Sequence, residues 1–112
     1  MNVVFNGLLW EITYTEPTTN SDSSPLNDLK ETQVFHDDGL GGPFQARNPS
    51  PATSPQGGGI ITSGGSMASF MGPNESRTFR FYTLAIDNDL NISLPSPVVT
   101  GVCETLAPAP PS

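Results

Sequence analysis

Apolar and polar side chains alternate most regularly over residues 79–87, FRFYTLAID. A period of two, with aromatic and β-branched residues, is typical of a β-strand. The polar residues 87–91, DNDLN, form a turn that ends this strand, and after two prolines a second strand is predicted over residues 98–102. We interpret these segments as the closing hairpin of a β-sandwich. The apolar face of its first strand carries Phe79, Phe81 and Ala85.

The same alternation occurs near the beginning of the chain, where every second residue from Trp10 to Tyr14 is large and apolar. The dipeptide Asn6-Gly7 precedes this segment, and Asn-Gly is the strongest short signal for a hairpin turn. We therefore predict a short strand, a tight turn and a longer strand over residues 1–14. The predicted core consists of Trp10, Ile12, Tyr14, Phe79, Phe81 and Ala85.

The middle of the chain contains shorter candidate strands and long loops. Residues 29–36, LKETQVFH, fit a strand, and a short helix over residues 25–34 with Asn27 as its cap is the alternative. Residues 60–63 predict another short strand. Residues 45–59 are rich in proline and glycine, and a connection of this length is often functional. We expect this loop to contact a partner through Gln45, Arg47, Asn48 and Gln56.

The sequence TFRFYTLAIDNDLNISLPSPVVTGV, within residues 76–102, resembles the last two strands of a fibronectin type III domain. Residues 3–17 resemble an earlier part of that family, with residues 10–17 on its third strand and Phe5 where the family usually has tryptophan. Phe79 stands where the family has a corner tyrosine. The resemblance implies an all-β fold, an antiparallel immunoglobulin or fibronectin type III-like β-sandwich with long Pro/Gly-rich loops.

In this comparison the family's first strand and most of its second strand have no counterpart before Met1. A sandwich without that strand would leave a row of unpaired backbone groups along one sheet edge. We expect another protein subunit, of the same or a different chain, or this chain's own loop or tail, to cover the open edge.

The length of 112 residues fits a single domain. Hydrophobic residues make up only 35% of the chain, and it contains 11 glycines and 12 prolines, so we expect a modest core with proline-punctuated loops. We assign residues 1–103 to one domain and residues 104–112 to a proline-rich tail or linker with polyproline II character.

The formal net charge of −7 repels phosphate groups, so we expect neither nucleic-acid binding nor adsorption to an anionic membrane. No apolar run approaches the ~18 residues of a membrane span, and no secretory signal is visible after Met1. Cys103 is the single cysteine, and we interpret it as a small apolar residue at the end of the last strand. An intermolecular disulfide or a reactive thiol is the alternative.

Residues that could carry chemistry are few. His36 is followed by Asp37 and Asp38, which could belong to a catalytic triad or a metal site, but a histidine before Asp-Asp-Gly is more typical of a solvated turn. We therefore expect no catalytic residue and no cofactor. A second group has the alternate spacing of calcium ligands, although a turn that caps its own backbone is the preferred interpretation. These metal candidates are Asp87, Asp89 and Asn91.

Trp10 and Tyr82 could together form a platform on which a sugar ring stacks, as in a carbohydrate-binding module. The leading hypothesis is instead a non-catalytic structural or interaction module, a decoration or accessory component of a large assembly such as a phage virion. An adhesion or spacer module from a secreted cell-surface protein is the second hypothesis. Both place the chain on a virion or another extracellular surface.

Overall fold

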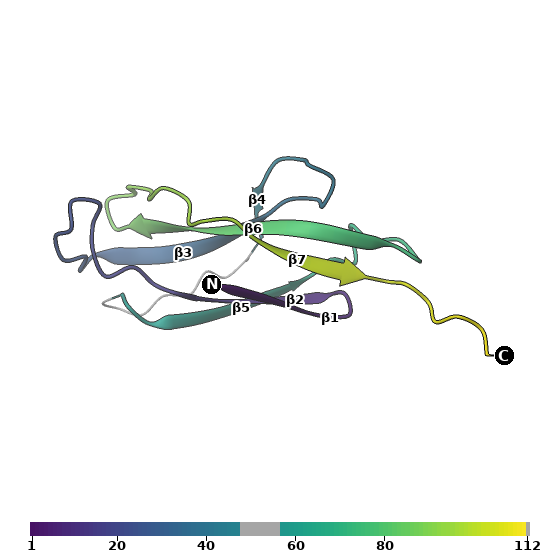
Figure 1. Cartoon of the computed structure of the whole chain (residues 1–112). Coiled ribbons are helices and arrows are strands. Elements are labelled where there is room, and N and C mark those ends of the chain that lie inside the picture. Colours follow the sequence, from purple (N-terminus) through teal and green to yellow (C-terminus); the bar gives the residue numbers. More distant parts are fainter. Residues whose placement is uncertain (48–56, 112) are drawn as a thin grey trace.

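The computed structural model describes residues 1–47 and 57–111. Within them every regular element is a β-strand, and no helix is present that is long and apolar enough to cross a membrane. The strands are β1 (Asn2–Asn6), β2 (Leu9–Thr15), β3 (Leu29–His36), β4 (Gln45–Ala46), β5 (Ile60–Ser66), β6 (Ser76–Asp87) and β7 (Val99–Glu104). They form two antiparallel sheets, β1-β2-β5 and β4-β3-β6-β7, which lie as two layers in Figure 1.

The three-stranded sheet begins with the predicted hairpin. Gly7 has a φ of 60°, which glycine adopts without strain, and it turns the chain from β1 into β2. Trp10 on β2 then lies opposite Phe5 on β1 and opposite Gly65 on β5. A Cβ on Gly65 would lie 2.7 Å from the Trp10 indole, so the missing side chain makes room for the ring.

The four-stranded sheet is built around β6. Residues 29–36, for which a short helix was the alternative, form the strand β3. Phe35 on β3 lies opposite Tyr82 on β6. β7 pairs only with the first half of β6, from Ser76 to Phe81. The β-branched and aromatic residues at the end of β3 favour this extended conformation.

Two serines take over the pairing where β7 does not reach. Ser93 donates its N–H to the carbonyl of Ala85 (2.8 Å), and the Ser93 hydroxyl accepts the N–H of Ala85 (2.9 Å). Ser96 makes the same two bonds with Thr83, at 3.0 and 2.9 Å. The prolines in this segment have no N–H to donate. The two hydroxyls therefore complete the hydrogen bonding of β6 where a regular ladder is interrupted.

The hydrophobic core lies between the two sheets and receives side chains from both. All predicted core residues except Ala85 are buried. Ala85 is half-buried because it lines a groove at one end of the molecule. Cys103 is fully buried, and its thiol lies 3.5 Å from the carbonyl oxygen of Gly7. The buried cluster consists of Trp10, Ile12, Tyr14, Val34, Met67, Phe79, Phe81 and Cys103.

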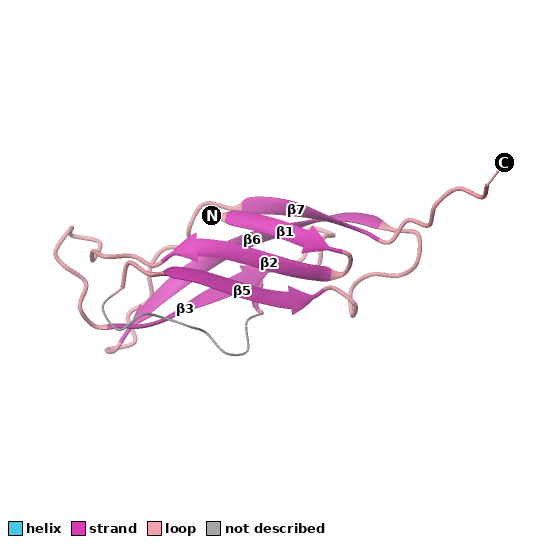
Figure 2. Cartoon of the chain, turned by 90° about the horizontal axis from the view of Figure 1, so that it is seen from below, coloured by secondary structure: helices cyan, strands magenta, loops and turns pink. Residues whose placement is uncertain are grey.

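Residues 10–17, which the resemblance placed on the family's third strand with the family's first strand missing, include most of β2. This strand has β1 and β5 on its two sides and lies in a different sheet from β6 and β7. The third strand is β3, whose alternation is obscured in the sequence by polar residues. β1 also packs against β7 of the other sheet. Gly101 on β7 leaves room for this contact, since a Cβ there would lie 2.7 Å from Phe5 and 2.9 Å from Val3. Figure 2 shows β1 and β7 side by side.

In its described part, which ends at residue 111, the C-terminal tail is bonded to the body at its beginning. Thr105 exchanges backbone hydrogen bonds with Asn74 and Glu75, and the N–H of Ala107 donates to the Asn74 side chain (3.0 Å). The following residues up to 111 extend away from the sandwich in Figure 1.

Candidate interaction surfaces

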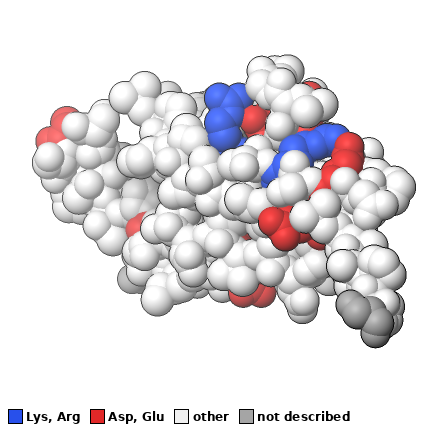
Figure 3. All heavy atoms as spheres, turned by 45° about the vertical axis from the view of Figure 1, so that its right-hand side comes forward, with Lys and Arg blue, Asp and Glu red and all other residues white. Residues whose placement is uncertain are grey.

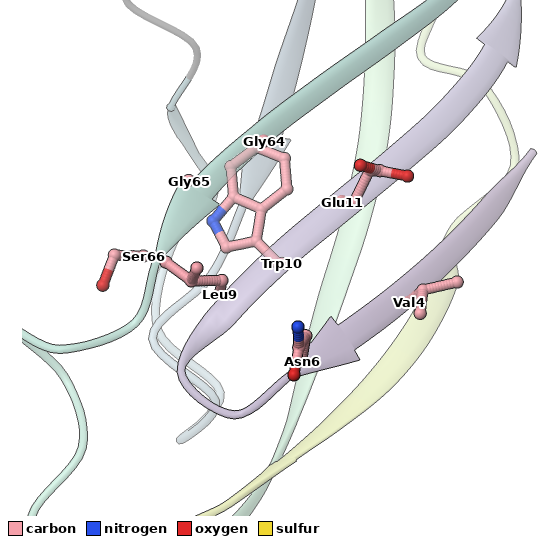
Figure 4. A pocket seen from close by; sticks show the side chains of 8 residues that line it. All are labelled: Val4, Asn6, Leu9, Trp10, Glu11, Gly64, Gly65 and Ser66. Carbon is pink, nitrogen blue, oxygen red and sulfur yellow. The ribbon is translucent and has the colours of Figure 1, made fainter.

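The outer face of the three-stranded sheet contains a hollow of about 630 Å³. Gly64 is central to it because Val4, Glu11 and Gly64 lie in one row across the sheet, and the third of them has no side chain. Figure 4 shows the side chains that surround it, from β1, β2 and β5. The lining residues are Val4, Asn6, Leu9, Trp10, Glu11, Gly64, Gly65 and Ser66.

Two apolar side chains in this lining are open to solvent. Leu9 is 58% exposed and Val4 is 53% exposed, whereas Glu11 is the single charged residue. Trp10 is only 3% exposed, so its indole belongs to the core. Exposed apolar side chains beside polar ones on an open sheet face have the composition of a small protein contact.

A second concave surface, a groove of about 750 Å³, lies where two loops meet beside the end of β6. These loops are residues 16–28 and 88–98, and the first loop and the beginning of the second are at the left end of Figure 1. Leu26 and Leu29 are buried beneath the groove, whereas Ile92 and Leu94 stand exposed along it. Ile92 is held there by a backbone bridge to Ile86 on β6.

The predicted calcium candidates lie in the turn at the edge of this groove. The carboxylate of Asp87 accepts hydrogen bonds from the backbone of Asp89 (3.0 Å) and from the backbone and side chain of Asn91 (2.8 and 3.0 Å). These bonds, above all the one from the Asn91 side chain, lower the pKa of Asp87. Asp87 and Asn91 therefore cap the turn, as the preferred interpretation expected. Asp28, which the sequence did not suggest, brings a third carboxylate near Asp87 and Asp89, all within 4.8 Å of one another.

The expectation of a solvated turn at the histidine is wrong. His36 and Asp37 are each only 1% exposed. The imidazole packs against Phe81 at 5.3 Å between ring centroids, and Nδ1 lies 2.6 Å from the carbonyl oxygen of Asp37. Burial lowers the pKa of His36, so the ring is neutral near pH 7. Arg47 is close to it, with Nε donating to the His36 carbonyl at 3.3 Å.

Asp37 serves the fold through a bond with β6. Its carboxylate accepts from the side chain of Arg80 at 2.7 Å, from the Arg80 backbone at 3.0 Å and from Gly39 at 3.1 Å. Burial alone would raise the pKa of Asp37, but these hydrogen bonds outweigh it and the pKa is lowered. Asp38 is engaged in its own loop, where it accepts from the backbone of Leu40.

Trp10 and Tyr82 do not form a shared platform. Trp10 packs in the core against Phe81, at 5.4 Å between ring centroids. Tyr82 follows Phe81 on the strand and therefore points to the outer face of its sheet. There it stacks on Phe35 at 5.1 Å and contacts Phe44 at 4.6 Å. The proposed sugar platform is therefore wrong, because the two rings lie on opposite faces of the four-stranded sheet.

Of the predicted partner-contact loop, residues 45–59, the structure describes residues 45–47 and 57–59. Gln45 is exposed on β4. Arg47 is half-buried, with its guanidinium 4.9 Å from the ring of Phe70, so it contributes to the fold. Asn48 and Gln56 lie outside the described residues.

The two concave surfaces were not predicted from the sequence. The adjacent residues Leu9 and Trp10 were a usable signal, because two neighbouring strand residues cannot both face the core. No protein-family model, curated protein or solved structure matches the chain.

Proposed function

We propose that the chain is a sandwich of the immunoglobulin or fibronectin type III kind that acts as a non-catalytic docking module. The strand order supports the fold. In immunoglobulin-type sandwiches the first, second and fifth strands share one sheet and the third, sixth and seventh share the other. These six strands divide in the same way here, whereas β4 pairs with β3 in the second sheet and the constant-type arrangement places its fourth strand in the first.

The observation that carries the docking role is the hollow around Gly64. Leu9 and Val4 are more than half exposed on a regular strand face, where alternation normally places polar residues. Contact with another protein would remove both side chains from water, and each contributes at most about 1.5–3 kcal/mol when fully buried. Among the described residues no strand pairs with the outer edge of β5, which borders the same face and could offer backbone groups to a partner.

The absence of catalysis in this proposal is supported by the state of the single histidine. His36 is neutral and enclosed by aromatic rings, and its neighbour Asp37 is bound by Arg80. Neither group is presented to a substrate. We propose a large extracellular assembly as the setting of this docking module, with a phage virion as the leading case.

The docking role is tested by replacing Leu9 with the photo-crosslinking residue p-benzoyl-phenylalanine in the source cells. Illumination should join the chain to one defined protein in a fast-sedimenting particle. The matched control carries the crosslinker at Leu40, an apolar loop residue that is 73% exposed and lies outside the hollow. A discrete product from position 9 alone supports the proposal. Equal products from both positions, or a chain that sediments as a monomer in the extract, would refute it.

A spacer in a multidomain surface protein is the second candidate, and the tail favours it. The bonds of Thr105 and Ala107 fix the direction in which residues 108–111 leave the body. In that case the complete gene encodes further domains beside this one, and the Leu9 crosslinker gives no intermolecular product.

A further inference from the structure

The groove beside the end of β6 combines an apolar interior with acidic margins. Its floor is formed by the buried Leu26 and Leu29, and its most exposed wall residues are Ile92 at 64% and Leu94 at 89%. Isolated apolar residues on a surface are normal, but several of them around one concavity mark a binding site.

The charges of the two lining segments have one sign. Residues 17–29 and 85–94 contain no lysine, arginine or histidine, and Lys30 is the first basic residue beyond them. At the end that carries these loops, to the left of Figure 3, red acidic atoms are visible and blue basic atoms are not. The acidic residues of the two segments are Asp22, Asp28, Asp87 and Asp89.

We propose that this groove binds an extended segment of a partner protein in which leucine or isoleucine alternates with lysine or arginine. The inference rests on the proposed docking function and names a second contact and its chemistry. The apolar side chains of the segment would lie against Ile92 and Leu94, and its cations would face Asp28 and Asp89. Burying apolar surface supplies affinity, while opposite charges select and orient the partner.

The geometry favours a peptide over a bare cation. The carboxylate oxygens of Asp87 already accept hydrogen bonds from the N–H groups of Asp89 and Asn91. A metal ion would also leave Ile92 and Leu94 exposed. An alternating peptide uses both features, because in an extended chain successive side chains point in opposite directions.

The test is a titration of the isotope-labelled chain with a short synthetic peptide that alternates lysine and leucine. Binding is monitored by NMR through the backbone amide chemical shifts. Two peptides of equal length serve as controls, one alternating glutamate and leucine and the other lysine and serine. The lysine–leucine peptide should shift the amides around Ile92 and Leu26. Ile92→Ser should weaken its binding at least about tenfold, which corresponds to about 1.4 kcal/mol. Asp89→Asn should weaken it less and should reduce its dependence on salt.

Val102→Ser is the matched control variant, because Val102 is 50% exposed on β7 and lies outside the groove. The inference is overturned if the lysine–serine peptide binds equally well, if the glutamate–leucine peptide does so, or if Val102→Ser weakens binding as much as Ile92→Ser. Leu9→Lys should leave the peptide affinity unchanged. A crosslink from position 9 without peptide binding would therefore refute the groove alone, and peptide binding without that crosslink would refute only the proposed function of the sheet face.

Discussion

The packing of Trp10 against Gly65 allows a sharp test of the core. In Gly65→Ala the new Cβ would lie 2.7 Å from three indole atoms, Cε2, Cζ2 and Nε1. Ordinary contacts between carbon atoms are about 3.5–4.0 Å, so the ring would have to move by roughly 1 Å. It has little freedom to move, because Phe81 and His36 lie against it at 5.4 and 5.8 Å between centroids.

Two opposing effects determine the magnitude. Overpacking a well-filled core costs about 1–3 kcal/mol. Alanine also stabilises by about 0.4–1 kcal/mol relative to glycine where the backbone allows it, because it restricts the unfolded chain. We expect the free energy of unfolding to fall by about 1–2 kcal/mol, which for a domain near this size lowers Tm by roughly 4–16 °C.

Urea unfolding followed by tryptophan fluorescence and circular dichroism measures the change. Thr62→Ala, at an exposed position on the same strand, should stay within about 0.5 kcal/mol of the wild type. In a Trp10→Phe background, which lacks the single tryptophan and is followed by circular dichroism alone, the effect of Gly65→Ala should shrink, and the double-mutant cycle gives the coupling energy. A Gly65→Ala protein as stable as the wild type, or an undiminished effect in the Trp10→Phe background, would refute this account of the packing.

Three further predictions concern polar groups. Burial lowers the pKa of His36 in the folded chain. As the pH falls below about 6.5, the ordinary pKa of histidine, the imidazole takes up a proton in the unfolded chain more readily than in the folded chain. The free energy of unfolding should therefore decrease as the pH falls below this value, by up to about 1.4 kcal/mol per pH unit. Unfolding at pH 6.5 and pH 5 should show this loss in the wild type and not in His36→Gln, and an identical slope in both would contradict it. Tyr14→Phe removes the buried 2.8 Å hydrogen bond to Thr32 and should cost about 0.5–1.5 kcal/mol in denaturant unfolding; no change would mean that the bond contributes nothing. Ser93→Ala should accelerate hydrogen exchange at the Ala85 amide, and an unaltered rate would show that the hydroxyl does not protect it.

The strands that the sequence predicted best are those with one buried face. β2 and β6 alternate regularly because their side chains face the core and the surface in turn, so Trp10, Ile12, Phe79 and Phe81 could be recognised as core residues. Met67 could not, because it lies in a loop after β5, where no period applies, and yet it is fully buried.

Burial of the polar residues depends on contacts between distant parts of the chain. Asp37 is paired with Arg80, 43 residues away, and nothing in the local sequence His-Asp-Asp-Gly indicates that partner. The groove likewise joins Leu26 to Ile92, which meet only because the ends of β3 and β6 are neighbours. Ala85 was assigned to the core because its strand position is correct, but the opposite layer does not cover it there.

The serine–proline segment has a consequence for how this molecule behaves in crowded solution. Its hydroxyls accept the amide N–H groups of Thr83 and Ala85, and its prolines have no N–H to donate to a foreign strand. The far half of β6 is thereby shielded from fibril-like stacking between copies. Association would be directed to the faces whose side chains are suited for it.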